Sequence, residues 1–345
     1  MSHRLLHALE CQPADRVAFL PAIYEHKAWF VGSTPSVVCR DVNLFTTAVL
    51  AEYERAQPDA LTIGLDVYNV EAEAVGCKVK YYDGDDTSIP SIGPEGAIFQ
   101  GLEDVASLKV PDPHKDGRMP VNLEVARNIV KVLEKEVPIR GAVSGPFSMA
   151  ANLVGSEHLF MLIITQPRLV KELLAFSAVV IEKFGEAFIE VGCGVVLFDS
   201  QASPDLLSPA MYHDFVLGPT KKIIAHFHQL GLKHVPLIIG GNTTKILDSY
   251  LETGANNILC DSPADVQQFL ERCSSANRAF RRNLDSSDFL TATPEELRRR
   301  TLDCLGQSQR YPGFILGTGV VPYGTPPENL TAVREALREY TEKRR

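Results

Sequence analysis

The sequence predicts an α/β protein built as one (β/α)8 TIM barrel, with an insertion between strands two and three. Eight short, β-branched and apolar segments recur along the 345 residues, each separated from the next by enough chain for a helix. Several are apolar almost throughout, as expected of parallel strands buried on both faces. Strand–helix alternation repeated eight times favours a parallel barrel with right-handed crossovers. The doubly wound open sheet is the alternative, but no Gly-x-Gly-x-x-Gly opens a first helix.

The predicted strands share short length and a high content of β-branched and apolar residues. They are Val17–Ile23, Ala60–Leu65, Ile139–Ser144, Gly194–Phe198, Val235–Ile239, Asn257–Cys260, Ala279–Asn283 and Gly313–Leu316.

Apolar residues at helical spacing predict the intervening helices. Ser156 is expected to cap a long helical segment that runs to about Val191 and breaks near Pro167. The other predicted helices are Asn43–Gln57, Val121–Glu136, Pro209 to about Leu230, Thr244–Thr253, Pro263–Cys273, Pro294–Leu305 and Pro327–Lys343.

Three of these helices have capping signals at their start. Ser208 followed by Pro209 is a typical N-cap and first helical residue. Thr293–Glu296 and Thr325–Glu328 each combine threonine, proline and glutamate, which indicates a capped, acidic helix start.

Residues 67–120, between strands two and three, exceed what a minimal barrel needs. Lys78–Tyr82 alternates polar and apolar residues and leads into Asp83-Gly84, a hairpin-type turn. We therefore predict an insertion over the barrel mouth. The chain has no Ser/Gly-rich linker, so residues 1–345 are expected to form a single domain.

Composition limits the classes of function. The net charge of −9, with 45% hydrophobic and 22% charged residues, is ordinary for a globular protein and argues against a broad nucleic-acid surface. No apolar run approaches the roughly 20 residues of a membrane span, and the N-terminus lacks a signal-peptide pattern. The seven cysteines are scattered and form no C-x-x-C. We expect a cytoplasmic protein that acts on a small molecule, without nucleic acid or membrane; a homodimer is compatible with the sequence.

Polar side chains follow most of the predicted strands, where a (β/α)8 barrel places them over its mouth. An aspartate at such a position can also cap a helix or hold a loop, and Glu25-His26 can be a solvated loop pair. Several polar groups that converge on one mouth nevertheless predict an active site there. These candidates are Tyr24, Glu25, His26, Asp66, Tyr68, Asn69, Glu71, Asp199, Gln201, Asn242 and Asn283.

Several segments at the strand ends carry a family resemblance. They are Pro58–Ala60 leading to Asp66–Glu73, Ser144–Ser148, Phe198–Ser203 with Leu207–Pro209, Gly241–Leu247, Asn283–Asp285 and Gly324–Asn329. With them the chain resembles the uroporphyrinogen decarboxylase superfamily, which also contains methylcobalamin:coenzyme M and other corrinoid-linked methyltransferases. The resemblance covers nearly the whole chain and leans toward the methyltransferases. It implies a (β/α)8 barrel, in agreement with the strand count.

The zinc pattern of those methyltransferases is broken here. They hold zinc with a His-x-Cys before a Gly-Asn-Thr and with a Cys near the last strand, because soft sulfur ligands suit a thiol-activating zinc. In this chain the corresponding positions are Ile238 and Gly240, and the last-strand segment Gly317–Val321 has no cysteine. Zinc is therefore not expected at that place.

The decarboxylase pattern is broken too. Those enzymes use an arginine-rich N-terminal segment, an aspartate after strand two, a tyrosine after strand three and a histidine near the last strand. Here Asp66 is retained, but residues 20–29 contain no arginine, residues 149–152 contain no tyrosine, and Thr318 stands at the histidine position. A site lined with carboxylates would also repel a polyanionic tetrapyrrole.

The resemblance and the strand ends favour a corrinoid-linked methyltransferase or demethylase that acts on a small methylated substrate. The predicted catalytic residues are His26, Glu71, Asp66 and Asp199, with His26 and Glu71 as the main pair, because a Glu–His pair can shuttle a proton near neutral pH. The predicted substrate-binding residues are Tyr24, Glu25, Tyr68, Asn69, Gln201, Asn242 and Asn283.

Any metal is expected at a site other than the family's usual zinc positions, and any corrinoid is expected to arrive on another protein. If a metal is used, the candidate ligands of a relocated zinc site are His26, Glu25 and Glu71. The chain contains no Asp-x-His-x-x-Gly of a cobalt-ligating loop, so a corrinoid would be supplied by a partner protein.

Two other functions stay open. A uroporphyrinogen-type decarboxylase, a lyase, would need Lys27, Arg281 or Arg282 to hold the reacting carboxylate. A non-catalytic barrel that binds a ligand or a corrinoid protein is supported by the missing zinc ligands.

Overall fold

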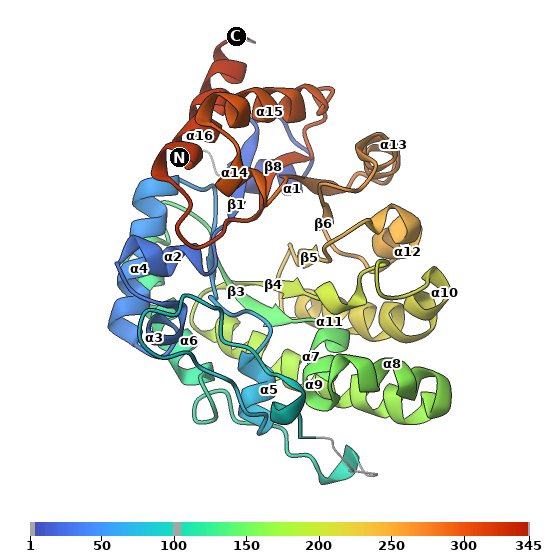
Figure 1. Ribbon diagram of the computed structural model, residues 1–345. Helices are drawn as coiled ribbons and strands as arrows, with labels where there is room; N and C mark the ends of the chain where they lie inside the picture. Colours follow the sequence, from blue (N-terminus) through green and yellow to red (C-terminus); the bar gives the residue numbers. More distant parts are fainter. Residues whose placement is uncertain (1–3, 99–104, 344–345) are drawn as a thin grey trace.

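The computed structural model describes residues 4–98 and 105–343 (Figure 1). Within these residues eight strands are arranged as two four-stranded parallel sheets, in the orders β1-β8-β7-β6 and β2-β3-β4-β5. The two sheets are the halves of one (β/α)8 barrel, which confirms the predicted fold. The strands are β1 (Ala18–Ala22), β2 (Leu61–Ile63), β3 (Ile139–Ser144), β4 (Gly194–Phe198), β5 (Leu237–Ile238), β6 (Asn257–Cys260), β7 (Ala279–Leu284) and β8 (Phe314–Val320).

Side chains join the two halves where the backbone ladder is interrupted. Between β5 and β6, the Tyr250 hydroxyl donates to the carbonyl of Leu237 at 2.8 Å and accepts from the amides of Ile239 at 3.0 Å and Leu259 at 3.2 Å. Between β1 and β2, the Asp59 carboxylate accepts from the amide of Phe19 at 2.7 Å, and the Asp59 amide donates to the Phe19 carbonyl at 2.9 Å. Both seams are thus closed by hydrogen bonds that involve a side chain.

The helices lie outside the strands, as Figure 1 shows. They are α1 (Arg4–Leu9), α2 (His26–Phe30), α3 (Pro35–Val38), α4 (Val42–Ala56), α5 (Val70–Val75), α6 (Met119–Leu133), α7 (Pro146–Val154), α8 (Ser156–Thr165), α9 (Pro167–Glu190), α10 (Pro209–Met211), α11 (Gly218–Gln229), α12 (Leu247–Glu252), α13 (Val266–Ala276), α14 (Asp288–Thr291), α15 (Pro294–Gly306) and α16 (Pro327–Glu342). A π-helical turn, Tyr212–Leu217, joins α10 to α11, and Thr243–Ile246 forms a 3-10 turn before α12.

Two predicted caps are confirmed and two are wrong. Ser208 accepts a hydrogen bond from the Met211 amide, and Thr293 forms a reciprocal capping box with Glu296. Ser156, by contrast, is the first residue of α8, and Gly155, with φ +84°, occupies the cap position. Thr325 does not cap α16 either, because its hydroxyl donates to the Pro322 carbonyl at 2.9 Å and Pro326 precedes the helix.

Among the short helices that were not predicted from the sequence, two follow β1 and β3. Residues 26–30 form α2, and residues 146–154 form α7. Both are short, so helical periodicity has little length in which to show itself. Their positions matter because α2 begins at a predicted catalytic residue and α7 begins next to the end of β3.

The insertion between β2 and β3 contains little regular structure among its described residues. One antiparallel bridge joins Lys80 to Ser91 across the predicted turn, in which Gly84 has φ +63°. The insertion contacts neighbouring elements at two places: Tyr82 donates its amide to Ser36 of α3, and Ile98 donates its amide to the Leu153 carbonyl of α7. Its placement over the mouth stays a prediction.

No single helix in the described ranges is long and apolar enough to cross a membrane; α7 and α8 reach that length and apolarity only when taken together, across a bend of 102°.

Candidate functional site

An apolar ring lines the barrel interior toward the carboxyl ends of the strands. Tyr24 and Tyr68 each meet Phe198 edge-on, with ring centroids 5.6 Å and 6.3 Å apart and interplanar angles of 89°. The buried residues of this ring are Ala22, Tyr24, Val67, Ala142, Val196, Phe198, Ile238 and Leu259. We call them the interior ring, and Tyr68 packs against them. An apolar wall with a few polar groups is typical of a small-molecule site.

Asp199 follows Phe198 at the end of β4 and is fully buried. One carboxylate oxygen, Oδ1, accepts from the Ser148 amide at 2.7 Å in the first turn of α7. The other, Oδ2, has no hydrogen-bond partner, and burial raises the pKa of Asp199 to about 6. Residue 145 must be glycine for this arrangement, because a Cβ there would lie 2.2 Å from the Asp199 Cγ. Asp199 therefore caps a helix and also keeps one free oxygen.

Glu71, on α5, holds the end of β3. Its two oxygens accept from the Ser144 amide at 2.6 Å and the Ser144 hydroxyl at 3.0 Å. The side chain is fully buried, and this burial raises the pKa of Glu71 to about 7. Glu71 is thus protonated part of the time at neutral pH, although both oxygens are engaged.

Arg118, which the sequence did not single out, neutralises Asp66. Its guanidinium donates to the two Asp66 oxygens at 2.8 Å and 2.7 Å, and its Nε donates to Glu73 at 2.6 Å. All of this is nearly buried: Asp66 and Arg118 are each 5% exposed. Asn69 also donates to Asp66, at 3.2 Å. Arg118 belongs to the insertion, 52 residues from Asp66, and no motif or spacing marks it.

The remaining predicted binding residues lie at several strand ends. Tyr68 and Ser200 share a hydrogen bond of 2.6 Å, and burial raises the pKa of Tyr68. Asn242 caps the turn before α12 by accepting from the Thr244 amide, and Gln201 is placed by its own amide, which donates to Ser148. Asn283 donates to Asp261 at 2.9 Å, while its amide oxygen has no partner.

The end of β1 differs from the solvated loop that was one reading of its sequence, because Glu25 and His26 are both buried. Glu25 has one oxygen without a hydrogen-bond partner, and burial raises its pKa to about 7. The His26 ring stacks on Trp29 at 5.2 Å and meets Phe30 edge-on at 4.6 Å, and neither ring nitrogen has a hydrogen-bond partner. Burial lowers the pKa of His26 to about 4, so the ring is neutral at pH 7.

The predicted pair of His26 and Glu71 is therefore not brought together. Glu71 bonds to Ser144, whereas His26 packs among aromatic rings. A histidine enclosed by aromatic side chains stabilises helix packing, and a proton relay would require the ring nitrogens to meet a donor or an acceptor.

Neither the family's zinc site nor the relocated one is assembled. In residues 4–98 and 105–343 no three His, Cys, Asp or Glu side chains lie close enough together to bind one metal ion. Ile238 belongs to the interior ring, and a Cβ on Gly240 would face oxygens of Asp261 at 3.6 Å and Ser200 at 3.8 Å. These positions offer no sulfur or nitrogen ligand, so zinc does not fit them.

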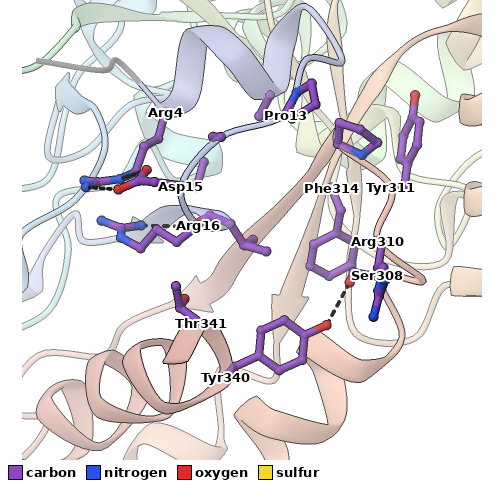
Figure 2. A pocket seen from close by; sticks show the side chains of 15 residues that line it. Arg4, Pro13, Asp15, Arg16, Ser308, Arg310, Tyr311, Phe314, Tyr340 and Thr341 are labelled. Carbon is purple, nitrogen blue, oxygen red and sulfur yellow. Dashed lines mark hydrogen bonds and ion pairs between the residues drawn. The ribbon is translucent and has the colours of Figure 1, made fainter. Parts of the chain in front are cut away.

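A cavity of about 300 Å³ lies at the opposite end of the barrel, where β1 and β8 begin (Figure 2). Two of its arginines are already paired, Arg4 with Asp15 at 2.6 Å and Arg16 with Asp59 at 2.6 Å, and the third, Arg310, is exposed to solvent. Active sites of (β/α)8 enzymes lie at the carboxyl ends of the strands. We therefore place the candidate site at the interior ring and the strand ends above it.

Comparisons with known proteins give the chain a family. The sequence model of the family described as Uroporphyrinogen decarboxylase (URO-D) matches residues 1–340. Methylcobamide:CoM methyltransferase MtbA of Methanosarcina acetivorans is 29% identical, over 98% of this chain and 97% of its own length. A uroporphyrinogen decarboxylase of Alkalilimnicola ehrlichii is 26% identical, over 97% of this chain and 93% of its own. The solved structure of a methyltransferase from Methanosarcina mazei superimposes with a TM-score of 0.86 at 23% identity and covers 98% of each chain.

Proposed function

We propose that this chain, which belongs to the URO-D family, transfers a methyl group between a small methylated substrate and a corrinoid carried by a partner protein. The MtbA-type relatives, named as methylcobamide:CoM methyltransferases, support the reaction class. The observation that carries the proposal in this chain is Asp199, a buried carboxyl with a free oxygen and a raised pKa. It lies beside Phe198 of the interior ring.

Asp199 can supply the proton that removal of a methyl group from oxygen or nitrogen requires. The Ser148 amide fixes Oδ1, which leaves Oδ2 to hold the proton. As the bond from the methyl carbon to the oxygen or nitrogen breaks, the proton passes from Oδ2 to that atom, and the substrate leaves as an alcohol or amine. A corrinoid, when bound, supplies the cobalt that exchanges the methyl group. Positioned general acids of this kind contribute about 10²–10⁴-fold to rates.

The other groups of the ring would position the substrate. Tyr68, held by Ser200, and Tyr24 each pack edge-on against Phe198, and Asn283 offers an unpartnered amide oxygen. Because no zinc ligands meet in the described residues, we assign no step to zinc. We therefore propose methyl ethers or methylamines as substrates, which leave after protonation, in place of thiols activated by zinc.

Decarboxylation of uroporphyrinogen has less support. It relies on an aspartate after strand two, and in this chain both oxygens of Asp66 accept hydrogen bonds from Arg118. A tetrapyrrole would have to displace a buried, bidentate guanidinium, and breaking such a pair costs several kcal/mol.

The test uses free cob(I)alamin and a panel of small methyl ethers and methylamines, with methylcobalamin formation followed by visible absorption. We expect formation with the wild-type protein and about a hundredfold slower rate with Asp199→Asn, which keeps the oxygen that caps α7. Uroporphyrinogen is assayed in parallel. Conversion of uroporphyrinogen to coproporphyrinogen, together with no methylcobalamin from any donor, would contradict the proposal.

A further inference from the structure

Two arginines point into the barrel without a carboxylate partner. Arg281 is the third residue of β7 and pairs in register with Leu259, a member of the interior ring, so both side chains face inward. Arg140, on β3, lies two residues before Ala142 of the ring and therefore faces the same way.

The Arg281 side chain lies across β8 and reaches the ring. A Cβ on Gly317 would lie 2.6 Å from the Arg281 Cγ and 2.7 Å from its Cδ, so the glycine leaves the space that the arginine occupies. The charge of the Arg281 guanidinium lowers the pKa of both Tyr24 and Tyr68 against the larger effect of burial, which places both hydroxyls within its electrostatic reach. Arg281 is 5% exposed.

These charges are not neutralised within the part of the chain that the structure describes. No ion pair there includes Arg281 or Arg140, and the Nε of each has no hydrogen-bond partner. Arg140 donates to the Thr62 hydroxyl at 2.9 Å, and burial together with the charge of Arg281 lowers its pKa to about 10. Glu52, the carboxylate whose charge reaches Arg140, is engaged with Lys27 at 3.0 Å.

The carboxyl groups of the mouth do not serve as counter-charges either. Burial raises the pKa of Glu71 and of Glu25 to about 7, so roughly half of each charge is absent at neutral pH. Asp199, whose pKa is raised to about 6, is mostly ionised there, but among the described residues it forms no ion pair with Arg281 or Arg140. Asp261 accepts from the Gly241 amide and from Asn283. A buried cation without a partner costs several kcal/mol, and a bound anion removes that cost.

We propose that Arg281, with Tyr24, binds the anionic end of the substrate, so that the substrate is a small methylated carboxylate, sulfonate or phosphate. The guanidinium fork matches the paired oxygens of such groups, and the interior ring covers the apolar part that carries the methyl group. Arg140 lies deeper and adds positive charge. The methylated character of the substrate rests on the proposed function, whereas the anion site stands on the two arginines.

The test is calorimetric titration with methoxyacetate, 2-methoxyethanesulfonate and methyl phosphate, and with neutral 2-methoxyethanol, without corrinoid. We expect at least one anion to bind, the neutral compound not to bind, and Arg281→Met to weaken anion binding about 10- to 100-fold. Arg299→Gln, an exposed position on α15, is the control and should leave binding unchanged.

Thermal unfolding separates a binding role from a structural one. Without anion, Arg281→Met should melt at or above the wild-type temperature, because an unpaired buried charge has been removed; with anion, only the wild-type protein should gain stability. If Arg281→Met does not fold, Arg281→Lys keeps the charge but loses the fork, and should bind more weakly. No anion binding to the wild-type protein, or an affinity that these variants leave unchanged, would overturn the inference.

This result is independent of catalysis. Anion binding without methylcobalamin formation would contradict the proposed function and leave the anion site standing. Methylcobalamin formed from neutral donors alone would contradict the anion site and leave the proposed function standing.

Discussion

The two halves of the barrel have the same architecture but differ in how their buried carboxyls and arginines are partnered. In the β2–β5 half, Asp199 and Glu71 accept hydrogen bonds from backbone amides at the ends of neighbouring elements, and Asp66 is paired with Arg118. In the β6–β8 and β1 half, Arg281 has no ion-pair partner among the described residues, and its charge lowers the pKa of Tyr24.

This difference separates groups that hold the fold from groups that are free to bind. Carboxyls in the first half connect strands to helices by hydrogen bonds, and only Oδ2 of Asp199 has no hydrogen-bond partner among them. Arg281 in the second half forms no ion pair among the described residues, and neither does Arg140 on β3 of the first half, which leaves their charge for a ligand. A substrate in the interior ring would then meet an acid on one side and a cation on the other.

The strongest test of the first half is Arg118→Met. It leaves the Asp66 carboxylate buried without its partner, so we expect the free energy of unfolding to fall by about 3–5 kcal/mol. Urea unfolding measures the loss, with Arg127→Met, an exposed position on α6, as the control. A loss below about 1 kcal/mol would mean that Asp66 is not held as the structure shows.

The seam between the halves is tested by Tyr250→Phe. Removal of the hydroxyl leaves two amides and one carbonyl of β5 and β6 without that partner, and we expect a loss of about 2–3 kcal/mol. Tyr53→Phe is the control, because no described hydrogen bond uses the Tyr53 hydroxyl. Equal stability of the two variants in urea would show that the seam does not depend on Tyr250.

The pH dependence of stability distinguishes the halves next. Asp199 and Glu71 have folded-state pKa values raised to about 6 and 7, above their ordinary values of 3.8 and 4.5. Their contribution is therefore fully present below about pH 4 and is lost as pH rises through 6 to 7, on the order of 3 kcal/mol per group over the whole range.

Urea unfolding at pH 5 and pH 8 measures this loss in the wild-type protein and in the double variant Asp199→Asn with Glu71→Gln. The wild-type protein should lose more stability than the variant on going to pH 8. The same pH dependence in both proteins would show that the two carboxyls are ionised in the folded state.

The smallest expected effect is that of Tyr68→Phe. It removes the hydrogen bond to Ser200 while keeping the edge-on contact with Phe198, so we expect a stability loss of about 1 kcal/mol or less. Urea unfolding measures this loss. A loss of more than about 2 kcal/mol would contradict the minor structural role given to this hydrogen bond.

Much of the fold could be predicted from the sequence, because buried parallel strands leave a strong local signal. The bounds predicted for β3, β4 and β6 agree with the structure. The capping box of α15 was also visible, since its two partners are three residues apart.

The site was harder to predict because it is made of long-range contacts. Asp199, a predicted catalytic residue, lies at a strand end as expected, but its contact with Ser148 joins residues 51 apart. Arg118 reaches Asp66 from the insertion, and no sequence pattern around Arg118 predicts this ion pair. His26 looked like a mouth residue because α2 was too short to recognise. Nothing local shows that Arg281 lacks a counter-charge, which is a property of the whole barrel.

The most direct measurement is the pH profile of methylcobalamin formation by the wild-type protein and by Asp199→Asn, with a donor from the panel. If Asp199 supplies the proton, the wild-type rate falls as pH rises through about 6, and this fall disappears in Asp199→Asn together with most of the rate. A wild-type rate that is constant or rises from pH 5 to pH 8, or an unchanged rate in Asp199→Asn, would contradict the account.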